Sequence, residues 1–159
     1  MNEPPPAEIL RRLRPIPTYR DHPATSAVDI EGVDLSGAPA RVGIVGAAEP
    51  VLLLFLSSGC QGCRDLWEGA TELRRALPAG VRVVHVTRGP DAEDARVVAG
   101  LAQPATLTVM STTAYHDYRV GGPPFLVVVS GDVVRTEGVA WGITETARAT
   151  RRALEREPG

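Results

Sequence analysis

Two cysteines, Cys60 and Cys63, are the residues of this chain whose type and spacing best suit chemistry. They stand three positions apart in FLSSGCQGCRDLW, directly after an apolar run. If a helix begins here, its unpaired N–H groups and its dipole favour a thiolate at Cys60. Thiolate is the nucleophile of disulfide exchange. Cys63 would follow one turn later on the same helix face, placed to attack a mixed disulfide on Cys60.

The residues around the two cysteines modify this chemistry. Gln61 and Gly62 separate the pair, and neither carries a charge. Gly62 lets the first helical turn stay open. Arg64 follows Cys63, and we expect its positive charge to increase the thiolate population of Cys60.

Two other interpretations of the C-x-x-C remain open. The first is a pair of buried structural cysteines. The second is a metal site, because C-x-x-C is half of a zinc site. The sequence has no second C-x-x-C, and its histidines, His22, His85 and His116, stand singly. His116 is the candidate that a copper-handling protein would need beside the cysteines.

Composition excludes several classes of protein. The chain has 159 residues, of which 43% are hydrophobic, enough for one domain with a core and no disulfide staples. The net charge is −2 and all 17 basic residues are scattered arginines, which argues against nucleic-acid binding. The longest apolar run, 51–56, is far shorter than the ~18 residues that cross a bilayer.

The N-terminal sequence predicts where in the cell the protein is found. Its sequence, MNEPPPAEILRRLRPIP, lacks the apolar segment of a signal peptide. We therefore expect a cytoplasmic protein without a membrane span. A removed N-terminal anchor or signal would make it extracytoplasmic or membrane-anchored instead.

Elements that must position the cysteines follow from the hydrophobic pattern. Residues 1–26 form a Pro-rich arm with one short helix at 7–14, and 27–159 form the domain. In the domain we expect strands at 28–30, 41–45, 51–56, 81–86, 106–110, 125–130 and 133–137, and helices at 61–77, 91–99 (capped by Asp91), 113–118 and 144–156. Strands that alternate with helices, followed by a hairpin and a closing helix, predict an α/β fold with a mixed sheet. We expect Trp67, Phe125 and Trp141 in the core.

The strand that ends in FLSSGCQGC, followed downstream by VGGPPFLVVVSGDVV, resembles the thioredoxin-like superfamily. Within it, the TlpA-like and MauD-like thiol–disulfide oxidoreductases are most similar, over residues 27–156. The resemblance implies a thioredoxin-like fold: a mixed central sheet flanked by helices, with an added N-terminal β-hairpin at 28–45. It implies catalysis by Cys60 and Cys63 without an organic cofactor or metal. The partners would be a protein disulfide or dithiol and an upstream electron donor or acceptor.

A cis-proline faces the redox pair in that family, and Pro124 matches its position. The residue before it normally offers a backbone N–H to an extended substrate. Here that residue is Pro123, which has no N–H, so we expect weaker docking that uses only its carbonyl. The resemblance thus implies substrate contacts at Pro123, Pro124, Gln61 and Gly62.

The sequence also departs from thioredoxin itself. The acid that thioredoxin places six residues before the first cysteine is Leu54 here, so we expect proton transfer through water. Gly59 replaces the tryptophan that precedes the pair. Three functions therefore stay open: an oxidoreductase of undefined direction, a non-catalytic binding or metal-handling module, and a peroxidase that uses the same fold. The third is the weakest, because this chain lacks the Thr/Pro-rich segment that precedes the reactive cysteine in such peroxidases.

Overall fold

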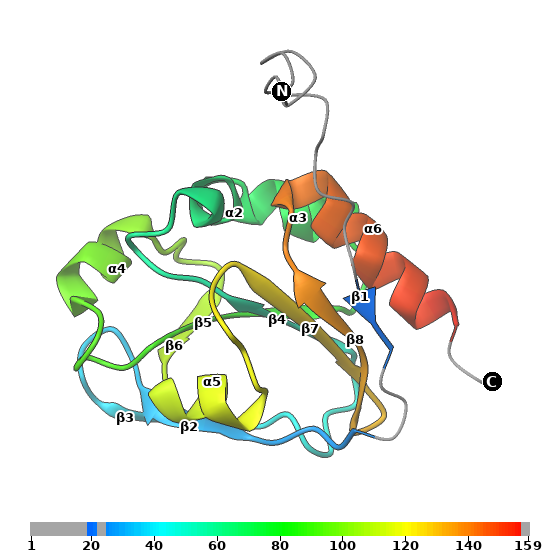
Figure 1. The fold of residues 1–159 in the computed structure, drawn as a ribbon, viewed down its shortest axis with the longest axis horizontal. Coiled ribbons are helices and arrows are strands. Elements are labelled where there is room, and N and C mark those ends of the chain that lie inside the picture. The colour runs from blue at the N-terminus through cyan, green and yellow to red at the C-terminus, as the bar shows by residue number, and fades with distance from the viewer. Residues whose placement is uncertain (1–18, 22–24, 157–159) are drawn as a thin grey trace, which may run out of the picture.

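The structure is a computed structural model, and it describes residues 19–21 and 25–156. One sheet of eight strands runs through it in the order β1-β8-β7-β4-β5-β6-β2-β3 (Figure 1). The strands are β1 (Tyr19–Arg20), β2 (Ile30–Val33), β3 (Pro39–Val42), β4 (Val51–Phe55), β5 (Arg82–Thr87), β6 (Leu107–Met110), β7 (Phe125–Ser130) and β8 (Val133–Val139). Strands β4, β5 and β6 are parallel, and β7 is antiparallel to β4. The expected mixed sheet is confirmed.

Helices cover both faces of the sheet. They are the 3-10 helix η1 (Gln61–Cys63), α2 (Arg64–Glu68), α3 (Ala70–Ala76), α4 (Ala95–Leu101), α5 (Thr112–Asp117) and α6 (Gly142–Glu155). Figure 1 shows α2, α3 and α6 on one side of the sheet and α5 on the other. The helix expected at 7–14 lies outside the described residues. No helix in the described ranges combines the length and the apolar character needed to cross a membrane.

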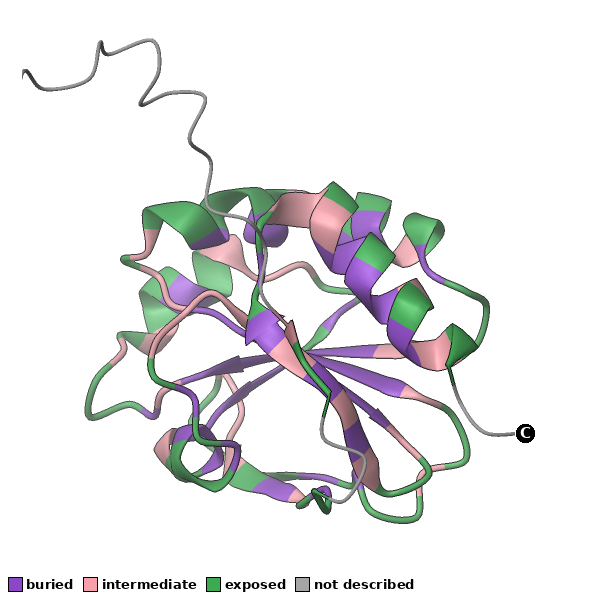
Figure 2. Cartoon of the chain, turned by 45° about the vertical axis from the view of Figure 1, so that its right-hand side comes forward, coloured by how far each residue is buried: buried purple, intermediate pink, exposed green. Residues whose placement is uncertain are grey.

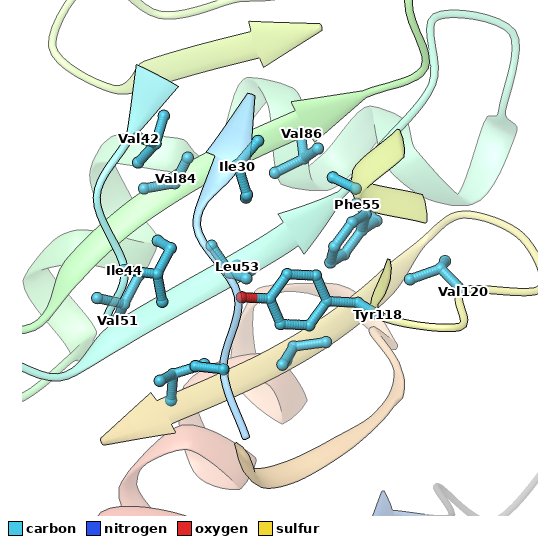
Figure 3. Packing of buried hydrophobic residues seen from close by; sticks show 14 of the residues in the cluster. Ile30, Val42, Ile44, Val51, Leu53, Phe55, Val84, Val86, Tyr118 and Val120 are labelled. Carbon is cyan, nitrogen blue, oxygen red and sulfur yellow. The ribbon is translucent and has the colours of Figure 1, made fainter. Parts of the chain in front are cut away.

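Strand β4 separates two hydrophobic clusters, because alternate side chains of a strand point to opposite faces. All five of its residues are buried, as its continuous apolar run predicts. Figure 2 shows the strands at the centre of the sheet as largely buried. Leu53 and Phe55 pack with Tyr118, whose ring lies 5.9 Å from that of Phe55 (Figure 3). Leu52 and Leu54 face the other way, toward α2, α3 and α6.

The N-terminal hairpin formed by β2 and β3 is confirmed, and it joins the edge of the sheet at β6 through Val33 and Met110. Gly32 permits this approach, since a Cβ there would lie 2.1 Å from the Met110 carbonyl oxygen. Tyr19 and Arg20 lie in the region expected as an arm, yet they pair with β8. The arm therefore contributes a strand, and the boundary at 26–27 stays a prediction.

Two expected helices differ from the structure. The helix at 61–77 is divided into η1, α2 and α3, with a bend at Gly69 (φ −93°, ψ 17°). A Cβ at Gly69 would lie 2.9 Å from Ile143 on α6, so the bend brings two helices close together. Helix α4 begins later than expected and is capped by Asp94, whose carboxylate accepts the Arg96 N–H at 2.9 Å. The expectation that Asp91 caps this helix was wrong. Residue 91 lies in a turn, in which the Ala92 and Glu93 N–H groups donate to the Gly89 carbonyl.

Candidate active site

The C-x-x-C motif stands where the central strand gives way to helix, as the sequence predicts. The Leu56 N–H still bonds the Val86 carbonyl at 2.9 Å, and a short turn then leads to Cys60 at the start of η1. Cys60 is partly exposed, whereas Cys63 is completely buried. The two sulfurs therefore differ in their access to solvent.

Burial determines the protonation of Cys63. It is the main cause that raises the pKa of this thiol to about 12, and a hydrogen bond with the Cys60 side chain adds to it. The Ser57 N–H, 3.5 Å from the Cys63 sulfur, acts in the opposite direction. Cys63 is therefore a thiol at neutral pH, and it must lose its proton before it can attack.

Cys60 occupies the expected N-cap, with an extended backbone (φ −90°, ψ 118°). Its side chain makes no capping hydrogen bond, and the expected effect of the helix start on Cys60 stays a prediction. The Arg64 side chain is exposed, and its Nε lies 3.9 Å from Glu68 Oε1. Its influence on Cys60 stays a prediction.

The proline loop meets the redox pair. The Pro123–Pro124 peptide bond is cis, which confirms the expectation. A Cβ added at Gly62 would lie 3.5 Å from the Pro124 ring and 3.9 Å from the Cys60 sulfur, so these three residues adjoin. The pairing of Phe125 with Phe55 explains this, because it brings the start of β7 beside the end of β4.

A pocket of about 330 Å³ opens beside Cys60. Gln61, Arg64, Trp67 and Leu101 are among the residues that line it. The pocket therefore adjoins the partly exposed cysteine of the pair.

Trp67 supports the turn before Cys60 from within the core, where it was expected. Its indole N–H donates to the Ser57 carbonyl at 3.1 Å, and its ring meets that of His85 edge-on at 5.2 Å. Trp141, in contrast, is 43% exposed, so its expected place in the core was wrong. It follows Ala140, whose N–H binds the Pro124 carbonyl, and thus lies just beyond the proline loop.

Sequence reasoning missed the contact of Glu93 with the active-site turn and the hydrogen bond that Tyr115 makes to Leu56. The Glu93 carboxylate accepts the Ser58 hydroxyl at 2.6 Å, and the Tyr115 hydroxyl donates to the Leu56 carbonyl at 2.9 Å. The local pattern around residue 93 suggests only an acidic helix start. The sole usable signal was the parallel pairing of two neighbouring strands, which brings the loops after them to one edge.

Metal ligands do not gather in the part of the chain that the structure describes. No three His, Cys, Asp or Glu side chains there are close enough to share an ion. His85 is buried against Trp67, His116 is exposed, and His22 lies outside the described residues.

Comparison with known proteins identifies the fold. No family model matches the chain, and no curated protein matches it. Among solved structures, the thioredoxin domain of a thiol–disulfide oxidoreductase from Bacteroides vulgatus is similar, with 17% identity, a TM-score of 0.63, and coverage of 84% of this chain and 97% of that chain.

Two further structures agree with this. A secreted disulfide oxidoreductase of Mycobacterium tuberculosis, homologous to E. coli DsbE, has 17% identity and a TM-score of 0.61 over 79% of this chain and 95% of that one. Apo Sco1 of Thermus thermophilus has 17% identity and a TM-score of 0.63 over 89% and 99%. The chain has the thioredoxin-like fold, as its sequence resemblance implies.

Proposed function

We propose that this protein is a thiol–disulfide oxidoreductase whose Cys60–Cys63 pair exchanges two electrons with a disulfide or dithiol of a partner protein. One observation carries the proposal: a partly exposed Cys60 stands above a buried Cys63, next to Pro124. Solved structures of the same fold include thiol–disulfide oxidoreductases, which supports it.

The proposed exchange runs in two steps. The Cys60 thiolate attacks a partner disulfide, forms a mixed disulfide, and releases the first partner sulfur as a thiolate. Cys63 then loses its proton and attacks the Cys60 sulfur. The Cys60–Cys63 disulfide forms, the bond to the partner breaks, and the partner is released as a dithiol, reduced by two electrons. The same steps in reverse oxidise a dithiol.

Partner docking is proposed at the surface around Cys60. Gln61, Gly62, Pro123 and Pro124 would form its rim, since the structure brings Gly62 and Pro124 to the sulfur. An upstream electron donor or acceptor would restore the pair. The cytoplasm stays the predicted location, although the similar protein of Mycobacterium tuberculosis is secreted.

A redox titration tests the proposed function. The protein is equilibrated in buffers with different ratios of reduced to oxidised glutathione and then alkylated. Mass spectrometry measures how many cysteines carry the alkyl group. We expect both cysteines to change together as one two-electron couple. A protein that instead binds stoichiometric zinc or copper when reduced, and exchanges no disulfide, would be the alternative binding or metal-handling module.

Pro123 should limit peptide docking, because it offers no N–H to an extended partner. We expect Pro123→Thr to bind a short cysteine-containing peptide about fivefold more tightly, the value of one added backbone hydrogen bond. Isothermal calorimetry on the Cys60→Ser background measures this without exchange. Pro123→Ala is the matched control and should gain as much, since it also restores the N–H. Unchanged affinity in both variants would contradict the prediction.

A further inference from the structure

Glu93 is the acidic residue tied to the turn that carries the redox pair. Its Oε2 accepts the Ser58 hydroxyl at 2.6 Å, and both of its oxygens lie 3.4 Å from the Ser58 N–H. Ser58 precedes Cys60 by two residues. Glu93 itself is half-buried, so its charge is only partly screened by water.

The loop after β5 holds Glu93 in this place. Strands β4 and β5 are parallel neighbours, so the segments that follow them meet at one edge of the sheet (Figure 1). The Ala92 and Glu93 N–H groups both donate to the Gly89 carbonyl, at 2.9 and 3.0 Å. Asp94 then caps α4. The backbone on both sides of Glu93 is thus held by hydrogen bonds, and its side chain reaches Ser58 in the loop that follows β4.

The charge of Glu93 acts on the groups around the active site. Burial is the main cause that raises the pKa of Cys63, and Glu93 adds to the rise. Burial also raises the pKa of Tyr115, with Cys63 and Glu93 adding to it and Arg88 opposing it. The Arg88 guanidinium lies 4.4 Å above the Tyr115 ring, and Arg64 pairs with Glu68.

Resting on the proposed exchange function, we propose that Glu93 is a positioning residue that shifts the Cys60–Cys63 couple toward its disulfide form. A thiolate exists only in the reduced protein, and a carboxylate nearby disfavours it. The disulfide carries no charge and is not affected. Reduced protein would therefore give up its two electrons more readily, since redox couples become oxidising when their reduced form is stabilised.

Glutathione equilibrium tests this role. In the reaction, reduced protein and oxidised glutathione yield protein disulfide and reduced glutathione, so electrons and protons balance. We compare wild type with Glu93→Gln, which removes the charge but keeps an oxygen to accept the Ser58 hydroxyl. Near pH 9 Cys63 still holds its proton, so the effect must come through Cys60, and we expect the variant's equilibrium to move about fivefold toward the dithiol. Near pH 5 the difference should vanish, because the carboxylate acts only on a thiolate and thiolates are scarce in acid.

Asp91→Asn is the matched control. It removes one negative charge from the same loop, but Asp91 accepts from the Thr112 hydroxyl instead and does not contact Ser58. It should shift the equilibrium less than about twofold at either pH. An equal shift in both variants, no shift in Glu93→Gln, or a shift toward the disulfide would overturn the role of Glu93. If wild type does not equilibrate as a two-electron couple at all, the proposed function itself fails.

Discussion

Cys63→Ser is expected to hold partner disulfides covalently on Cys60. The partly exposed Cys60 can still attack, whereas a serine at the buried position cannot resolve the mixed disulfide. With dithiobis(nitrobenzoic acid), wild type should release about two thionitrobenzoates per protein, one for each sulfur consumed. Cys63→Ser should release about one and retain the other, which intact mass spectrometry detects.

Cys60→Ser is the control for this trap. Its remaining thiol is completely buried, and burial is the main cause that raises the pKa of Cys63 in the wild type. We expect it to react with the reagent at least ~100-fold more slowly than wild type, because thiolate is scarce and access is blocked. If Cys60→Ser reacts as fast as wild type, or Cys63→Ser gains no adduct, the assigned order of the two cysteines is wrong.

Acidification from pH 7 to pH 4 should destabilise the fold through His85. The side chain is completely buried, and neither ring nitrogen finds a hydrogen-bond partner among the described residues. Burial, with a smaller effect of Arg74, lowers its pKa from 6.5 to about 4. The unfolded chain binds a proton near pH 6.5 while the folded protein does not. Stability is therefore complete above pH 6.5 and falls between pH 6.5 and 4, by about 3 kcal/mol for this group.

Urea unfolding at both pH values measures this loss. His85→Gln removes the titrating ring, so it should lose about 3 kcal/mol less than wild type between pH 7 and 4. His116→Gln, at an exposed histidine, is the control and should behave as wild type. The Val45 N–H is the main cause that lowers the pKa of Asp29 to about 2. The stability that Asp29 contributes is therefore lost at a more acidic pH than that of His85. Equal losses in wild type and His85→Gln would refute the role of His85.

Features that the sequence predicted are those that neighbouring residues encode. The run at 51–56 became the buried strand β4, because continuous apolar residues can be covered only on both faces. Gly131 and Asp132 formed the turn of the last hairpin, and both have a positive φ, of 60° and 66°. The position of Cys60 and Cys63 at a strand-to-helix junction followed from the same local pattern.

Other features depended on contacts between distant parts of the chain. The bend at Gly69 brings α6 close through Ile143, and the pairing of Tyr19 with β8 joins two segments that lie far apart in the sequence. Trp141 looks like a core residue by composition, yet the turn before α6 leaves it exposed. No periodicity in the sequence reports such contacts, since each needs a second segment to be in place.

Sequence alone determined which sulfurs could react and in which element they stand, because a C-x-x-C spacing and an apolar strand are local properties. Tertiary structure decided their environment. Only the packing of Trp67 and the surrounding core buries Cys63, and only the parallel pairing of β4 and β5 brings Glu93 to Ser58. The chemistry that we propose for the pair therefore follows from the motif, while the protonation of Cys63 depends on burial and on charges from elsewhere in the fold.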